Sequence, residues 1–143
     1  YGSIRELKEE LELFLERRQA IFLREKAQGE YEKLRGSGKQ HVDTEISFSH
    51  FHRARFAYEQ ALEIWPDDAE AKEGLADLFL LAIQYHLNRK ELEVVQELFR
   101  YTKPISAKQK EIFLKVKSRY EHELKERKRV EQIGVQYDFF PSG

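Results

Sequence analysis

The chain has 143 residues, of which 41% are hydrophobic, 36% are charged and 13% are aromatic. With 25 basic against 26 acidic side chains its net charge is −1, so no general electrostatic field attracts nucleic acid or an anionic membrane. The absence of cysteine excludes disulfides, zinc–thiolate centres and thiol catalysis, and no apolar run reaches the ~18 residues that span a bilayer. Ala, Glu, Leu, Lys and Arg dominate over proline and glycine, which favours helix over sheet.

The ends of the chain and its composition indicate its expected cellular location and whether it is part of a larger protein. The chain begins at Tyr1 without methionine and ends at Gly143, so we expect a fragment of a larger protein, whose catalytic or membrane parts would lie outside it. The first residues lack the apolar core of a signal peptide, and the missing cysteines fit a reducing compartment. We therefore expect a cytoplasmic location and no membrane segment in this fragment.

The first predicted element is a long helix over residues 1–35. Ser3 is placed to cap it, and Glu6 three residues later completes a capping-box pattern. About 30 helical residues extend roughly 45 Å, more than a small core covers. Apolar residues recur along it at intervals of three and four, with one interruption at Arg18; they are Ile4, Leu7, Leu11, Phe14 and Ile21. This coiled-coil-like stripe predicts a partner helix, either from this chain or from a second copy.

Residues 36–45 are predicted to form a flexible linker, natural or introduced, because Gly36-Ser37-Gly38 ends the helical pattern. The lysine that follows invites comparison with a phosphate-binding loop. That motif requires a glycine five positions before its Gly-Lys pair and a Ser or Thr after the lysine, but Lys33 and Gln40 stand there. No nucleotide site is expected.

Residues 46–101 are predicted to form the core, as three helices over 46–64, 69–87 and 90–101. Pro66 separates the first two, because its ring fixes φ and offers no N–H to a helix. Small and large apolar residues share one face of each of these two helices. The residues expected to pack in the core are Phe51, Ala54, Tyr58, Ala61, Leu62, Trp65, Leu75, Leu78, Phe79 and Ala82.

Residues 102–132 are predicted to form a long C-terminal helix that Ser106 caps. Its apolar stripe consists of Ile112, Val116, Tyr120 and Leu124. Gly134 is expected to end this helix. The strand-like alternation that follows then predicts an extended tail over residues 133–143, leading to another domain.

Ala54, Tyr58, Ala61 and Pro66 together resemble the second helix of a tetratricopeptide repeat (TPR), where a small–aromatic–small–Pro pattern closes a helical hairpin. The resemblance implies an all-α fold of TPR-like antiparallel hairpins, flanked here by long N- and C-terminal helices. The sequence of residues 61–79 also resembles the helical region C-terminal to the catalytic domain of large bacterial serine/threonine protein kinases, which implies a signalling role. The kinase signatures themselves are missing from the chain, so the resemblance implies no activity for this fragment.

No pattern in the sequence points to a catalytic or metal site. His50 and His52 are two residues apart, so on a helix they diverge and do not chelate one ion. Asp67, Asp68 and Glu70 are explained by the preference of acidic residues for a helix N-terminus. We expect no catalytic residue, no metal and no cofactor.

The sequence thus predicts a non-enzymatic protein–protein interaction or dimerisation scaffold, with a homodimer or another protein as partner and no small-molecule substrate. The expected interaction residues, buried across a two-fold interface, are Leu7, Leu11, Phe14, Ile112, Val116, Tyr120 and Leu124. One alternative is a peptide-binding adaptor with a groove beside Tyr58 and Phe79. Another is nucleic-acid binding through the basic residues of the fifth helix, which is disfavoured because glutamates interleave with them.

Overall fold

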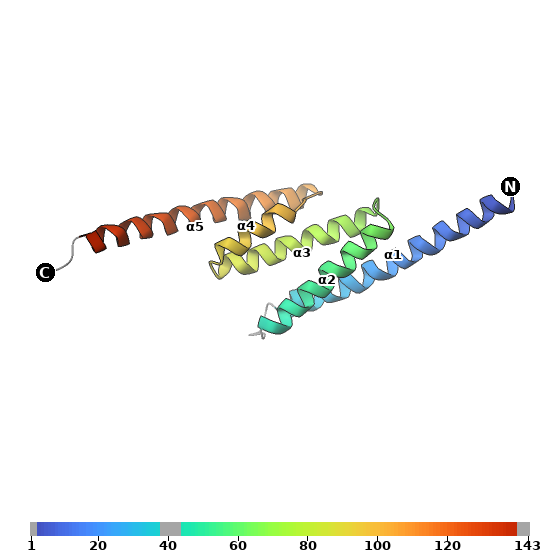
Figure 1. The fold of residues 1–143 in the computed structure, drawn as a ribbon, viewed down its shortest axis with the longest axis horizontal. Helices are drawn as coiled ribbons and strands as arrows, with labels where there is room; N and C mark the ends of the chain where they lie inside the picture. Colours follow the sequence, from blue (N-terminus) through green and yellow to red (C-terminus); the bar gives the residue numbers. More distant parts are fainter. Residues whose placement is uncertain (1–2, 38–43, 140–143) are drawn as a thin grey trace. The chain divides into compact units, whose positions relative to one another are not determined.

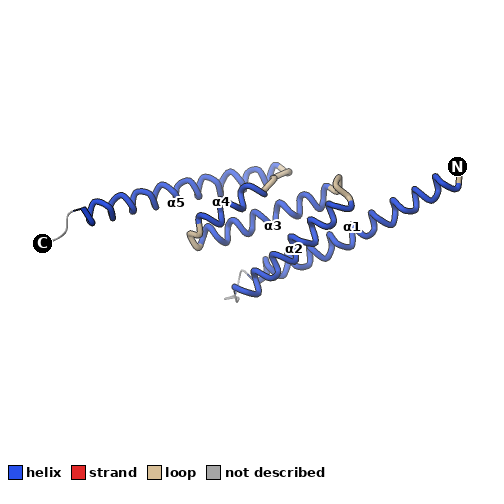
Figure 2. Tube along the Cα trace, viewed as in Figure 1, coloured by secondary structure: helices blue, strands red, loops and turns tan. Residues whose placement is uncertain are grey.

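The structure, a computed structural model, describes residues 3–37 and 44–139. Within these ranges the chain forms α-helices and no β-strand (Figures 1 and 2). The helices are α1 (Ile4–Ser37), α2 (Thr44–Ile64), α3 (Ala69–Asn88), α4 (Leu92–Tyr101) and α5 (Ala107–Phe139). The prediction of an all-α fold is confirmed.

The chain divides into two compact units, residues 1–78 and 79–143, and the boundary falls within α3. The first unit contains α1, α2 and the first half of α3, and α1 packs along α2. The second unit contains the rest of α3 with α4 and α5, and α4 packs on α5.

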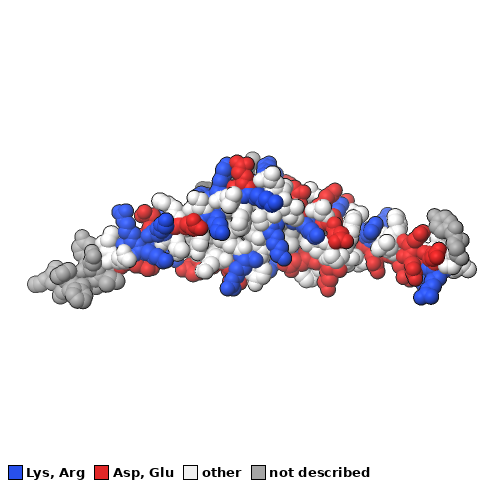
Figure 3. Space-filling view, turned by 90° about the horizontal axis from the view of Figure 1, so that it is seen from above, with Lys and Arg blue, Asp and Glu red and all other residues white. Residues whose placement is uncertain are grey.

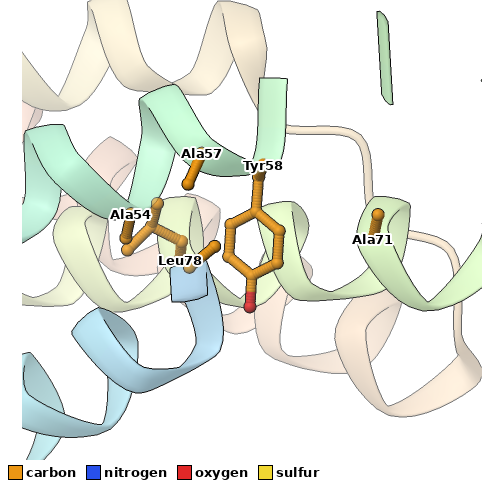
Figure 4. Close-up of a cluster of buried hydrophobic side chains, with 6 residues drawn as sticks. Ala54, Ala57, Tyr58, Ala71 and Leu78 are labelled. Atoms are coloured by element: carbon orange, nitrogen blue, oxygen red, sulfur yellow. The ribbon is translucent and has the colours of Figure 1, made fainter. Parts of the chain in front are cut away.

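The core of the first unit is built mainly from small side chains around one tyrosine. Figure 4 shows Ala54, Ala57 and Tyr58 projecting from α2 beside Ala71 and Leu78 of α3. Small residues let helix backbones approach closely, and a large ring then fills the space that they leave. The cluster is completed by buried Ala27 and by the half-buried Tyr31, Leu34, Phe51, Leu62 and Leu75.

The turn between α2 and α3 follows from the local sequence. Pro66 lacks a backbone N–H and α2 ends two residues before it, at Ile64. The Asp68 side chain then accepts a hydrogen bond from the Glu70 N–H at 3.2 Å, and the Asp68 carbonyl accepts one from the Lys72 N–H at 3.1 Å. Asp68 is therefore the N-cap of α3.

Two further helix starts carry the caps that the sequence predicts. Ser3 Oγ accepts a hydrogen bond from the Glu6 N–H at 3.2 Å, and Ser106 Oγ accepts one from the Gln109 N–H at 3.1 Å. Gln109 Oε1 in turn accepts from the backbone N–H groups of Ser106, at 3.4 Å, and of Ile105, at 3.0 Å. Ser106 and Gln109 form a reciprocal capping box, a pattern that the Ser-x-x-Gln spacing makes recognisable in the sequence.

The second unit is held by aliphatic and aromatic packing around α4. The Phe99 ring meets the rings of Phe113 and Tyr120 edge-on, each at 5.5 Å between centroids. Phe79 stacks with Tyr101 at 6.4 Å. The buried hydrophobic residues of this unit are Phe79, Leu80, Ala82, Ile83, Leu87, Leu92, Val95, Leu98 and Val116.

The predicted extended tail is wrong within the described residues, because the backbone of α5 continues helically to Phe139. Gly134 does not end the helix: an interior glycine costs about 1 kcal/mol relative to alanine, and Gly134 does not adopt the positive φ of a glycine C-cap. A lone strand would also leave its backbone groups unpaired, whereas a helix pairs them within the segment.

The predicted linker is shorter at both ends than expected. The described part of α1 runs to Ser37 and α2 begins at Thr44. The remainder of the predicted linker, residues 38–43, lies outside the described residues.

Candidate interaction surface

Helix α1 has two different faces, and only one of them packs in the first unit. The packed face carries Ala20 and Ala27, both fully buried, and Arg24 between them. Tyr31 and Leu34 continue this face one and two turns later and pack against the core cluster. These positions repeat every three or four residues, as expected for one side of a helix.

The other face carries an apolar stripe that no described residue of the first unit covers. We define the outer stripe as six exposed residues of α1: Ile4, Leu7, Leu11, Phe14, Leu15 and Phe22. Each is between 54% and 87% exposed. At 100° per residue, positions 4, 7, 11, 15 and 22 lie roughly opposite positions 20, 24 and 27 on the helix. The outer stripe is therefore a separate surface and not an extension of the core.

The first half of α1 is exposed on all sides. Residues 3–19 are all exposed, and Ala20 is the first buried residue of the helix. Just before it, the Arg17 guanidinium lies 5.3 Å from the Trp65 ring centroid, which places a cation–π contact at the edge of the packed region. The amino-terminal four turns of α1 thus expose apolar side chains that the first unit does not bury.

The two predicted interaction stripes, on α1 and α5, differ in how much of their side chains is exposed. Leu7, Leu11 and Phe14 are 56–58% exposed on α1. On α5, by contrast, Val116 is only 3% exposed, and Ile112, Tyr120 and Leu124 are half-buried. The prediction is revised for α5, because its apolar stripe packs within the second unit.

The predicted core residues occupy the interior of their own units. Six are buried: Ala54, Tyr58, Ala61, Leu78, Phe79 and Ala82. Phe51, Leu62, Trp65 and Leu75 are half-buried. Tyr58 and Phe79, the residues beside which the alternative of a peptide groove was placed, are 3% and 1% exposed.

The first unit also contains a polar cleft of about 300 Å³, whose lining includes Arg24, Tyr31, Tyr58 and Asp77. Burial, and then the nearby charge of Asp77, raises the pKa of Tyr58 to about 12. Burial likewise raises the pKa of Tyr31. Both phenols therefore remain protonated at neutral pH.

His50 and His52, the two histidines singled out in the sequence, have structural partners. His50 Nδ1 lies 2.5 Å from Glu30 Oε2, which joins α2 to α1. Burial would raise the pKa of Glu30, but the hydrogen bond to His50 and the charge of Lys33 outweigh it and lower the pKa overall. His52 instead contacts the Phe48 ring, at 4.2 Å between centroids. Residues 3–37 and 44–139 hold no group of three or more potential metal-binding side chains.

Charges do not segregate by sign on the visible surface. Basic and acidic side chains are interspersed over the face shown in Figure 3. On α5, Lys115 pairs with Glu111 at 3.2 Å, and Arg127 pairs with Glu93 of α4 at 2.6 Å. This interleaving does not provide the continuous basic track that a phosphate backbone requires.

Sequence reasoning missed three features of these surfaces. Leu15 and Phe22 extend the outer stripe, and the available signal was that Leu15 follows Leu11 by four residues and Phe22 follows Leu15 by seven. The ion pair between Arg24 and Asp68 joins residues 44 positions apart, for which a single sequence carries no signal.

No protein-family model, curated protein or solved structure matches this chain. Within the part of the chain that the structure describes, no helix has both the length and the apolar character required to cross a bilayer.

Proposed function

We propose that this chain is a non-catalytic scaffold that brings protein copies together through the outer stripe of α1. The observation that carries this proposal is the position of the stripe: six large apolar side chains are exposed on α1, five of them opposite its packed face and Phe14 beside these five. A contiguous exposed apolar surface on a helix is typical of a site that another helix covers.

The free energy gained by burying the outer stripe fits a reversible association. Complete burial of a Leu, Ile or Phe side chain contributes about 1.5–3 kcal/mol, so covering the exposed half of each contributes about 1 kcal/mol. Two copies would bury twelve such side chains, worth about 12 kcal/mol, against an association cost of about 4–15 kcal/mol. We therefore expect a dimer that forms and dissociates with concentration.

The finer description of this scaffold rests on the sequence. The spacing of Ala54, Tyr58 and Ala61 before Pro66 supports a TPR-like hairpin made by α2 and α3. The resemblance of residues 61–79 to a kinase-associated helical region supports a place in a multidomain bacterial signalling protein of the cytoplasm. In that setting the chain contributes assembly, and the catalytic step belongs to another part of the protein.

Sedimentation equilibrium over a wide concentration range tests the proposal. We expect the unmodified chain to dimerise and a Leu7→Glu/Leu11→Glu variant to be monomeric, because two carboxylates would be buried in an apolar contact. A matched control, Leu13→Glu/Gln19→Glu, adds the same charge at exposed positions outside the outer stripe and should leave the association unchanged. Helix content by circular dichroism should be equal in all three proteins. A monomeric unmodified chain, or equal association of the two variants, would reject the proposal.

A further inference from the structure

We infer that the partner of the outer stripe is a second copy of α1 that runs antiparallel. In the central layers of this pair, each residue lies opposite a residue of the other copy such that the two residue numbers add up to 25, as Leu11 and Phe14 do. This inference rests on the proposed function and adds the orientation and register of the pair. It follows from the heptad pattern of α1 and from the positions of two charges beside that pattern.

The apolar positions of α1 fit the a and d positions of a heptad. Ile4, Leu11 and Arg18 occupy a, and Leu7, Phe14 and Ile21 occupy d. Four of these six residues belong to the exposed outer stripe, and Ile21 is half-buried at the edge of the packed region. Arg18 is the single charged residue in the seam.

The position of Arg18 separates the two possible orientations. In a parallel, in-register pair, residues at a face their own counterparts, so Arg18 would meet Arg18 of the other copy inside the seam. In an antiparallel pair, a faces d. Arg18 then lies beside Leu7 of the other copy, while Leu11 faces Phe14 and Ile4 faces Ile21. The antiparallel arrangement removes the repulsion between two like charges, and it leaves the layers of Leu11 with Phe14 and of Ile4 with Ile21 fully apolar.

The flanking charges favour the same register. Glu10 and Arg17 both occupy g positions, and g positions of antiparallel helices lie side by side. The g residues flank the layers diagonally, so the numbers of two neighbouring g residues add up to 27 where those of the a and d residues add up to 25. Glu10 of each copy therefore meets Arg17 of the other, which gives two opposite-charge pairs. In a parallel pair, Glu10 would instead lie beside Leu15. Arg17 has donors for both contacts, because its planar guanidinium can stack on Trp65 and donate hydrogen bonds from its edge.

The register also determines the distance between the first unit of one copy and the first unit of the other. Ala20, where the packed face of α1 begins, would lie opposite Arg5 of the other copy. The two Ala20 residues are then 15 residues apart along the pair, about 22 Å at 1.5 Å per residue. A parallel pair would hold them at one helix diameter, about 10 Å. The antiparallel scaffold thus places the two first units at opposite ends of the paired helices.

Disulfide trapping tests the register directly, because the chain has no cysteine and each introduced thiol is unique. Leu11→Cys and Phe14→Cys proteins are oxidised separately and as an equimolar mixture, with Leu13→Cys as the control. The antiparallel register predicts a cross-linked dimer mainly in the mixture, because positions 11 and 14 face each other while two copies of position 11 lie too far apart for a disulfide. Rapid cross-linking of Leu11→Cys alone would establish the parallel arrangement and overturn the inference.

Charge exchange provides an independent readout by sedimentation. Glu10→Arg and Arg17→Glu should each weaken dimerisation about tenfold, and the combined variant should recover most of that loss. Because Arg17→Glu also removes the contact with Trp65, recovery is judged against that single variant.

The outcomes distinguish the two proposals. A dimer that cross-links in the parallel pattern, or shows no recovery on charge exchange, overturns the antiparallel register but leaves the scaffold function standing. A chain that stays monomeric and forms no cross-link overturns both.

Discussion

Arg24 of α1 is bound to Asp68, the N-cap residue of α3, through both carboxylate oxygens. Arg24 Nη1 lies 2.8 Å from Oδ1 and 2.7 Å from Oδ2. Asp68 is only 3% exposed, and its Oδ1 also accepts the Glu70 N–H. The Arg24 side chain reaches the exposed Glu70 carboxylate as well, at 3.2 Å. One buried carboxylate therefore joins α1 to the start of α3 and caps α3 at the same time.

Replacing Asp68 with alanine is expected to destabilise the chain by about 3 kcal/mol, because the half-buried Arg24 loses its main partner and α3 loses its cap. Chemical denaturation followed by circular dichroism measures the change. Asp67→Ala is the control, since Asp67 is an exposed neighbour with the same charge. Equal stabilities for the two variants would contradict the central role of Asp68.

Gly74 is required for the close approach of α3 to Tyr58. A Cβ atom at Gly74 would lie 2.6 Å from Cε1, Cζ and Oη of Tyr58, a side chain that is only 3% exposed. Gly74→Ala should therefore destabilise the chain by about 1–3 kcal/mol, although alanine is the better helix former.

Gly29 supplies the matched comparison for Gly74. It also lies in a helix, but a Cβ there meets nothing within 4 Å. Gly29→Ala should stabilise the chain by up to about 1 kcal/mol through helix propensity. Thermal denaturation of the two variants should thus shift in opposite directions. Stabilisation by Gly74→Ala would show that the ring of Tyr58 relocates easily.

The end of α3 holds a lysine in a conformation that favours glycine. The Lys90 N–H donates to the Leu87 carbonyl and the Glu91 N–H donates to the His86 carbonyl, which together form a Schellman motif. Lys90 has φ of 59°. Lys90→Gly should stabilise the chain by about 1 kcal/mol, because glycine adopts this region without a Cβ clash. Lys90→Ala should give no such gain in melting temperature, since it keeps the Cβ.

The sequence alone predicted the helices well wherever one residue dictated the backbone. Pro66 ends α2, and Ser3 and Ser106 cap α1 and α5, because these effects act within one turn of chain. The strand-like alternation after Gly134 was misleading, because strand formation depends on distant segments and not on the local sequence alone. Alternation over so few residues favours a strand only if a neighbouring strand is available to pair with it.

The sequence could not decide what covers an apolar stripe. Leu7 and Leu11 on α1 and Val116 and Tyr120 on α5 follow the same spacing of three and four. Yet Leu7 and Leu11 are more than half exposed, while Val116 is buried and Tyr120 packs against Phe99. Spacing reports that one face of a helix is apolar. Whether that face packs in its own unit or is left for another chain depends on contacts between distant segments.

His86 should make the stability of the chain depend on pH. Its Nδ1 is buried without a hydrogen bond among the described residues, and the Glu91 carboxylate lies 3.6 Å away. Burial lowers the pKa of His86 below 6.5, against the opposing effect of Glu91. Because the unfolded chain then binds a proton more readily than the folded one, the free energy of unfolding should decrease as pH falls from 6.5 towards the lower pKa of the folded state. Urea denaturation between pH 7.5 and pH 5 should show a smaller decrease for His86→Gln than for the unmodified chain, with His122→Gln, at an exposed position of α5, as the histidine control. An unchanged pH dependence in His86→Gln would assign the acid sensitivity to other groups.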